Sequence, residues 1–184
     1  MSEKKRGFPV WLTLALICLL VAGILGIVNE VTKGPIAEGL AEKAFASRKA
    51  AFPNADSFNE IPVPEGDPAE ECFEAYENGE LTGYVVKTTV SGCKGPIEIQ
   101  AGYDTDGKIT AVTCGGSSFQ ETAGLGAKVK DESFREQFRG KKAPLSYDDE
   151  GIDAITGATV SSKAVLGGLN GLGEYVSDLI SSEG

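Results

Sequence analysis

The chain has 184 residues, no histidine, and 17 lysine and arginine side chains against 27 aspartate and glutamate side chains. The absence of histidine excludes Ser-His-Asp and Cys-His catalytic arrangements and histidine metal sites. A net charge of −10 argues against a nucleic-acid-binding protein, whose contact surface would be basic. The four cysteines contain no C-x-x-C spacing, which argues against a zinc ribbon.

The first predicted element is an apolar run without charges from Phe8 to Val28. It holds 21 residues, enough to cross a hydrocarbon core about 30 Å thick at about 1.5 Å per residue. A secretory signal peptide would have a shorter apolar region that ends at a small-x-small cleavage site, and the residues after Gly26 make a poor one. We therefore predict an uncleaved single-span anchor, with residues 1–29 forming the N-terminus and the membrane segment.

Basic residues on the N-terminal side of the run predict its orientation. Lys4, Lys5 and Arg6 precede it, and cytoplasmic flanks of membrane helices are enriched in such residues. We expect a cytoplasmic N-terminus in the cell (inner) membrane and an extracytoplasmic body. Residues 29–184 carry 14 basic and 26 acidic side chains, so we do not expect the body to bind anionic lipid headgroups.

The elements of the body are predicted in chain order from residue spacing and turn residues. Residues 30–52 have helical spacing, with a possible kink at Gly34-Pro35, and form a linker with the loop that follows, up to residue 79. Strands and a short helix are then expected, followed by a final helix with an apolar stripe. The ranges are a loop at Pro53–Pro68, strands at Leu81–Val90, Ile97–Tyr103 and Ile109–Cys114, and a helix at Asp131–Phe138.

These elements indicate an α+β fold, with an antiparallel sheet and flanking helices in residues 80–184. Three cysteines, Cys72, Cys93 and Cys114, lie beyond the anchor. A compartment outside the cytoplasm permits disulfides without requiring them, and an odd number leaves at least one thiol unpaired within the chain. The sequence favours no particular pair.

The segment Asp153–Ser162 (DAITGATVSS) precedes the final helix and is rich in hydroxyl groups. We read it as a short strand, a glycine turn and a helix start. Backbone N–H groups at a helix start favour a phosphate, and Thr156, Thr159, Ser161 and Ser162 could add hydroxyl donors. Helix capping by the same side chains is the alternative, and composition alone favours it.

The spacing of this segment resembles the flavin-attachment motif of the extracytoplasmic FMN-binding domain family: Asp, two variable residues, Ser or Thr, Gly, Ala, Thr. In that family a flavin transferase joins FMN through its phosphate to the last threonine. The resemblance implies Thr159 as the acceptor, framed by Asp153, Thr156, Gly157 and Ala158. A threonine hydroxyl is a weak nucleophile without a base, so an outside enzyme has to activate it.

A second segment, Gln120–Gly126 (QETAGLG), resembles the E-T-P-G-L-G loop of the same family, which wraps the isoalloxazine ring. The chain departs from that pattern at Ala123, where the family has proline. The resemblance implies that the following residues contact the flavin: Glu121, Thr122, Gly124, Leu125, Gly126 and Lys128. A catalytic Glu121–Lys128 pair or a solvated ion pair are the alternatives for two of them. We expect no catalytic site of the chain's own and no metal site.

An anchor, a linker helix and one flavin domain together resemble the G subunits of the Rnf complexes, which are ion-translocating ferredoxin:NAD⁺ oxidoreductases. The resemblance implies an electron-transfer subunit with covalent FMN, with other membrane and redox subunits and a flavin transferase as partners. The C subunit of the Na⁺-translocating NADH:quinone reductase shares the motifs and is the alternative. A third reading is a non-redox scaffold in which the motif only caps a helix.

Overall fold

The structure, a computed structural model, describes residues 10–149 and 151–183. It divides into two compact units, Met1–Phe45 and Ala46–Gly184. Helix α1 (Val10–Ala51) forms most of the first unit, and its last turn belongs to the second. Within the described residues, one segment, Leu14–Thr32, is long and apolar enough to cross a membrane, with a mean hydropathy of 2.4.

This helix confirms the predicted apolar helical segment, which is consistent with a membrane anchor, and the helix that follows it, and it is continuous through Gly34 and Pro35. The side chains of the apolar segment are exposed, with Leu19 at 74%, as expected for a helix whose surroundings are lipid. The basic residues Lys4, Lys5 and Arg6, on which the predicted orientation depends, lie outside the described residues.

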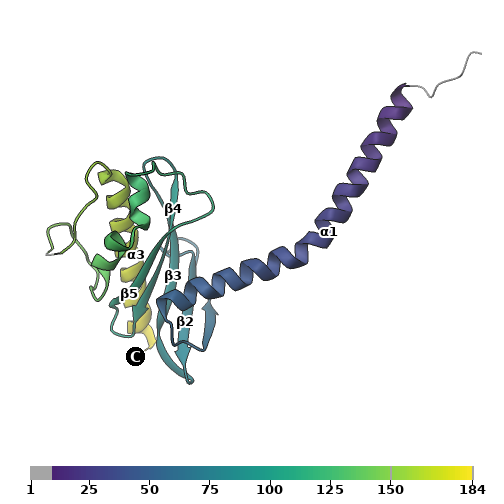
Figure 1. Cartoon of the computed structure of the whole chain (residues 1–184). Coiled ribbons are helices and arrows are strands. Elements are labelled where there is room, and N and C mark those ends of the chain that lie inside the picture. The colour runs from purple at the N-terminus through teal and green to yellow at the C-terminus, as the bar shows by residue number, and fades with distance from the viewer. Residues whose placement is uncertain (1–9, 150, 184) are drawn as a thin grey trace, which may run out of the picture. The chain divides into compact units, whose positions relative to one another are not determined.

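The second unit is built on one antiparallel sheet in which each strand pairs with the next along the chain (Figure 1). The strands are β1 (Ser57–Ile61), β2 (Glu71–Glu77), β3 (Glu80–Ser91), β4 (Pro96–Asp104) and β5 (Ile109–Gly115). The last three confirm the predicted strands. A hairpin meander of this kind keeps one face for the core and leaves the other free for a second layer.

The sheet has two strands that the sequence analysis did not predict. Strand β1 lies inside the range Pro53–Pro68, which was expected to be a loop, and β2 follows it. Strand β1 pairs with β2 alone, and its five side chains are exposed or half-buried. An edge strand of this kind carries a weak apolar signal, because only one of its sides is paired and little of it enters the core.

Helix α3 (Thr159–Glu183) covers one face of the sheet and completes the core (Figure 1). Its buried stripe includes Val165, Leu169, Leu172 and Val176, as the sequence predicts. Gly168 lets the helix approach the sheet, since a Cβ there would lie 2.6 Å from the Ile99 side chain.

The other face of the sheet receives the end of α1 and the residues after it. The Arg48 guanidinium lies 3.5 Å from the centre of the Phe73 ring. Phe52 packs against two glycines of the sheet: a Cβ at Gly83 would lie 2.6 Å from its ring, and a Cβ at Gly102 would lie 3.1 Å from it. Glycine therefore makes room here for an aromatic side chain.

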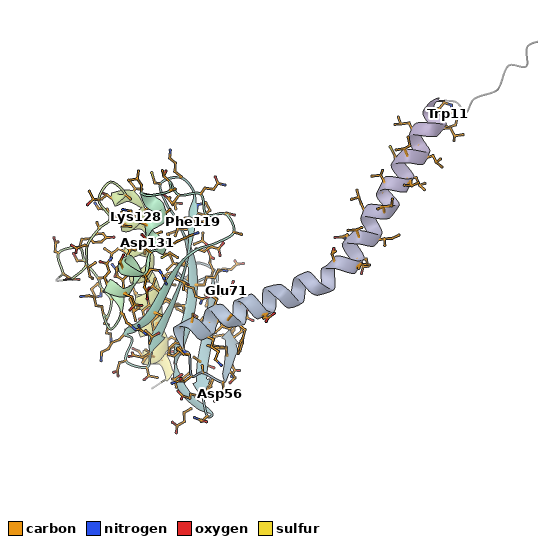
Figure 2. The ribbon with its side chains drawn as sticks, viewed as in Figure 1. Trp11, Asp56, Glu71, Phe119, Lys128 and Asp131 are labelled. Carbon is orange, nitrogen blue, oxygen red and sulfur yellow. The ribbon has the colours of Figure 1, made fainter. Side chains whose placement is uncertain are left out.

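The segment between β5 and α3 holds three short helices: η1 (Gly126–Lys130), α2 (Glu132–Arg135) and η2 (Glu136–Phe138). The helix predicted over Asp131–Phe138 is thus an α-helical turn followed by a 3₁₀ turn. Phe134 and Phe138 pack edge to face with ring centres 5.4 Å apart. Figure 2 places Phe119, Lys128 and Asp131 toward one end of the sheet and Asp56 toward the other.

Candidate functional site

The start of α3 is set by a glycine turn. The Ala158 N–H donates to the Ile155 carbonyl at 3.0 Å, and the Ser162 N–H donates to the Ala158 carbonyl at 3.0 Å. Gly157, between them, has φ +79°, a conformation that side chains other than glycine rarely adopt. Thr159 is the first residue of the helix. The first N–H groups of a helix have no partner within it, so they face the space before Thr159.

The stretch before this turn differs from the expected short strand. Residues 151–158 form turns and extended chain without strand pairing. Their position is fixed instead by Gln137, which bonds both backbone groups of Asp153: its Oε1 accepts the Asp153 N–H at 2.8 Å, and its Nε2 donates to the Asp153 carbonyl at 3.2 Å. The attachment-like motif is therefore held to the end of η2.

The four hydroxyl groups of the motif differ in exposure. Ser161 and Ser162 are fully buried, whereas Thr156 and Thr159 are exposed. The Ser161 hydroxyl donates to Glu121 Oε2 at 2.9 Å. The Ser162 hydroxyl donates to the Ala158 carbonyl at 3.0 Å and accepts the Ile155 N–H at 3.0 Å. The two serines hold the turn together, and the two threonines face solvent.

The predicted flavin loop lies against this helix start through Glu121, whose residue is 9% exposed. Its Oε2 accepts the Ser161 hydroxyl, and its Oε1 accepts the Lys94 N–H at 3.0 Å. Because Lys94 lies in the turn between β3 and β4, one carboxylate joins three segments that are far apart in the sequence. A buried carboxylate needs such hydrogen bonds to offset its lost hydration.

The tip of the loop is open. Gly124 has φ +77°, and a Cβ there would meet nothing within 4 Å, so glycine is required by backbone conformation alone. The Leu125 side chain is 45% exposed, and the neighbouring helix residue Val160 is 58% exposed. Leu125 Cδ2 would lie 3.2 Å from a Cβ at Gly157. An exposed apolar surface thus borders the glycine turn before Thr159.

Two residues of the predicted flavin set play backbone or packing roles here. The Thr122 carbonyl accepts the Leu125 and Ala127 N–H groups, both at 3.1 Å, and closes the loop. Gly126 is buried, and a Cβ there would overlap Glu121 Oε2. Ala158, from the attachment frame, is buried in the turn at 7% exposure.

Lys128 is exposed, and its backbone N–H donates to the Leu125 carbonyl at 3.0 Å. In the described part of the chain, the hydrogen-bond partners of the Glu121 carboxylate are Ser161 and Lys94. The structure therefore does not form the Glu121–Lys128 pair that the sequence left open as an alternative.

The sequence analysis missed three contacts of this region. It did not link Glu121 to Ser161, which is 40 positions away, nor to the turn at Lys94. It also missed the ammonium group of Lys130, which lies 3.7 Å from the centre of the Phe119 ring. No local spacing signals contacts over such separations. The sequence offered only Glu121 itself, a glutamate within a glycine-rich loop, and nothing in its spacing shows that it is buried.

The chemistry of the residues at this helix start suits an FMN group. The exposed Thr159 hydroxyl lies at a helix start, where backbone N–H groups and the helix dipole favour a phosphate. The exposed Leu125 and Val160 side chains offer an apolar surface for a flat aromatic ring. The buried polar groups Glu121, Ser161 and Ser162 already have partners. Such a site would bind the ring at the surface rather than enclose it.

Comparison with known proteins gives the same region a family assignment. Residues 92–172 match the FMN-binding domain family. The chain is 34% identical to the G subunit of the Na⁺-translocating ferredoxin:NAD⁺ oxidoreductase complex of Acetobacterium woodii, over 91% of this chain and 90% of that protein. It is 30% identical to the G subunit of the ion-translocating oxidoreductase complex of Methanosarcina acetivorans, over 96% and 98%.

Solved structures show a more distant likeness. NqrC of Shewanella oneidensis is 18% identical with a TM-score of 0.50, over 72% of this chain and 74% of that chain; at this identity the likeness concerns the fold. The C subunit of the Na⁺-translocating NADH-quinone reductase from Parabacteroides distasonis is 28% identical with a TM-score of 0.47, over 59% and 62%.

Proposed function

Since the chain belongs to the family of the G subunits of ion-translocating oxidoreductase complexes, we propose that it is the membrane-anchored electron carrier of such a complex. It carries electrons through an FMN joined by its phosphate to Thr159. Its contribution is to hold and orient the flavin beside other redox subunits, and the flavin supplies the electron chemistry.

One observation supports Thr159 as the attachment site: its side chain is exposed, whereas Ser161 and Ser162 are buried and hydrogen-bonded within the protein. Ser161 and Ser162 are fully buried and hydrogen-bonded, so an enzyme that delivers a flavin phosphate cannot reach them. Thr156 is exposed as well, but it precedes the glycine turn and is not part of the helix. Only Thr159 combines exposure with the helix start among these four hydroxyls.

The helix start also favours the product of attachment. A phosphodiester carries a negative charge, and a charge near the N-terminus of a helix gains about 0.3–1 kcal/mol at an exposed site. The chain places no acidic residue in the first turn of α3, so no carboxylate there repels the phosphate. The rest of the body carries more acidic than basic side chains, so a helix start without a carboxylate is a more favourable place for a phosphate than most of the surface.

Attachment requires a partner enzyme. A phosphate ester forms from an activated donor, so we infer a flavin dinucleotide, whose flavin-side phosphorus the Thr159 oxygen attacks. The new P–O bond forms as the bond between the two phosphates breaks. A nucleoside monophosphate leaves, and the threonine proton passes to a base of the flavin transferase. The chain has no histidine to act as this base.

The proposed location follows from α1 and its flank. The Leu14–Thr32 segment anchors the chain in the cell membrane, and the basic residues before it keep the N-terminus cytoplasmic. The FMN then lies on the extracytoplasmic side. A covalent tether is useful there, because it keeps the flavin at a high effective concentration near its redox partners.

The two alternatives are weaker. The C-subunit reading is supported by likeness of fold alone, whereas G subunits match over most of both chains. The scaffold reading requires that the motif only cap the helix, yet among the described residues the side-chain hydrogen bonds of this turn come from Ser161 and Ser162 and not from the exposed Thr159.

The experiment is a denaturing gel of the full-length protein produced together with a flavin transferase. We expect flavin fluorescence to migrate with the wild-type band and to be absent from Thr159→Ala. Circular dichroism should show the same fold for both, because the side-chain hydrogen bonds of this turn come from Ser161 and Ser162, and even the loss of a capping side chain costs only about 0.5–2 kcal/mol. A wild-type band without fluorescence would support the scaffold reading.

A further inference from the structure

The Glu121 carboxylate accepts hydrogen bonds from two segments that are distant in the sequence. Its residue is 9% exposed, and both of its oxygens accept hydrogen bonds from other segments: Oε2 from the Ser161 hydroxyl at 2.9 Å and Oε1 from the Lys94 N–H at 3.0 Å. The carboxylate thus faces into the protein, away from the open tip of the loop at Gly124.

Two glycines make the room for this carboxylate. A Cβ at Gly92 would overlap Oε1, and a Cβ at Gly126 would overlap Oε2 and lie 2.8 Å from the Ser161 hydroxyl. Neither glycine is among the residues with positive φ, so the backbone does not demand glycine at these positions. Space is what requires glycine here, and the Glu121 carboxylate is the group that a Cβ would meet first at both positions.

The bond to Ser161 holds the first turn of α3 in the rotation that the buried stripe of the helix sets. Successive residues of an α-helix are about 100° apart, so residues two apart lie on nearly opposite sides. Ser161 lies four residues before the buried Val165 and is turned inward to Glu121, whereas Thr159 is turned outward to solvent. The carboxylate therefore secures the turn in which Thr159 is exposed.

The same carboxylate holds the loop beside the turn. Glu121 is the second residue of the loop-like segment that ends at Gly126, and its side chain is fixed from both sides. The loop then brings Leu125 against Gly157, immediately before the attachment region. Displacing Glu121 would loosen the first turn of α3 and the loop together.

We propose that Glu121 is the positioning residue for flavin attachment: it binds Ser161, steadies the first turn of α3 in which Thr159 is exposed, and keeps the Thr122–Leu125 loop in place beside it. This inference rests on the proposed function. Ser161 beside a carboxylate has the makings of a nucleophile and its base, but it is fully buried, so the bond serves orientation.

The test uses the full-length chain with a flavin transferase and measures the initial rate of flavin incorporation and the residue that receives it. Glu121→Ala removes both hydrogen bonds. Glu121→Gln keeps the shape, and its amide can accept the Lys94 N–H through its oxygen and donate to the Ser161 hydroxyl through its nitrogen. Ser161→Ala removes one bond only. Glu60→Ala, at an exposed glutamate of β1, is the matched control.

We expect incorporation to fall at least about fivefold in Glu121→Ala, which corresponds to about 1 kcal/mol, and by less in Ser161→Ala. Glu121→Gln should recover most of the rate, and Glu60→Ala should match the wild type. The fluorescence anisotropy of the attached flavin should fall in Glu121→Ala, because the loop is no longer fixed. Rescue by the glutamine variant and loss of anisotropy would not follow from a general loss of stability.

Wild-type incorporation at Thr159 together with an unchanged rate and anisotropy in Glu121→Ala would overturn the positioning role and leave the proposed function intact. Equal defects in Glu121→Gln and Glu121→Ala would also overturn it. If Glu121→Ala fails to fold, Ser161→Ala decides: a wild-type rate in that variant contradicts the proposal. A wild-type chain that takes up no flavin would refute the proposed function itself.

Discussion

Gly126→Ala should destabilise the second unit although alanine is normally the better residue. An added Cβ would overlap Glu121 Oε2 and crowd the Ser161 hydroxyl at 2.8 Å. Gly126 is buried at the start of η1, so the methyl group cannot turn toward solvent. The carboxylate then has to move, and one or both of its hydrogen bonds lengthen or break.

The size of the effect follows from those two bonds. A hydrogen bond to a charged group contributes about 1.5–3 kcal/mol, so losing one costs about 1.5–3 kcal/mol and losing both costs about 3–6 kcal/mol. Replacing glycine by alanine returns about 0.4–1 kcal/mol, because the unfolded chain has less freedom to lose. If one bond is lost, the net loss is about 0.5–2.5 kcal/mol, which lowers the melting temperature by about 1–10 °C in a chain of this size.

Gly167→Ala is the matched control, with the opposite sign expected. Gly167 lies inside α3, is exposed, and a Cβ there would meet nothing within 4 Å. Alanine in a helix interior is more favourable than glycine by about 0.5–1 kcal/mol. The two substitutions are chemically identical, so their difference isolates the space around Glu121.

The assay is thermal unfolding of the full-length chain in detergent, followed by the near-ultraviolet circular dichroism of tyrosine. All five tyrosines lie in the second unit, whereas the single tryptophan, Trp11, lies in the apolar part of α1 (Figure 2). Tyrosine therefore reports the flavin domain. A melting temperature for Gly126→Ala equal to or above that of the wild type would refute the argument that the glycine is required by the carboxylate.

Three further predictions concern stability and topology. Burial raises the pKa of the Cys114 thiol to about 12 from an ordinary 9.0 and raises the pKa of Tyr103. Both groups stay protonated in the folded state above pH 9 while the unfolded state releases protons, so the free energy of unfolding should be highest below about pH 9 and fall as pH rises toward 12. A urea midpoint that does not change over this range would contradict the prediction. Tyr103→Phe removes the hydroxyl that donates to the buried Leu169 carbonyl at 2.9 Å and should cost about 1–3 kcal/mol in urea unfolding, against no change if that carbonyl finds another donor. Cys93 is exposed, so a membrane-impermeant maleimide should label it on intact spheroplasts and fail with Cys93→Ser; labelling only after permeabilisation would reverse the proposed orientation.

Much of the fold could be predicted because its strongest elements carry local signals. The anchor is a long run without charges, and β3 to β5 are rich in β-branched and aromatic residues, with glycine-containing turns between them. Strands β1 and β2 could not be found in this way. The stretch around β1 contains several proline and acidic residues, which are rare in strands. Strand β1 is stabilised by its pairing with β2, and local residue preferences do not reveal that pairing.

The sequence predicted the motif at Asp153–Ser162, but it did not predict which of the hydroxyl groups of the motif are buried. Hydroxyl residues before a helix all look like caps from the sequence, so Thr159 and Ser161 could not be told apart by physical reasoning. What separates them is burial by Glu121, which lies 40 positions from Ser161. A Cβ at Gly126, which the sequence predicts to contact the flavin, would overlap this carboxylate, and no local spacing signals that contact.

The central claim, that FMN is carried on Thr159, is tested most directly by peptide mass spectrometry of the protein purified from its native membrane. Trypsin should release the peptide that spans residues 143–163, which contains Thr156, Thr159, Ser161 and Ser162. We expect this peptide to carry the mass of FMN less one water and fragment ions to place it on Thr159. A peptide without the adduct, or with the adduct on another of these residues, would contradict the account.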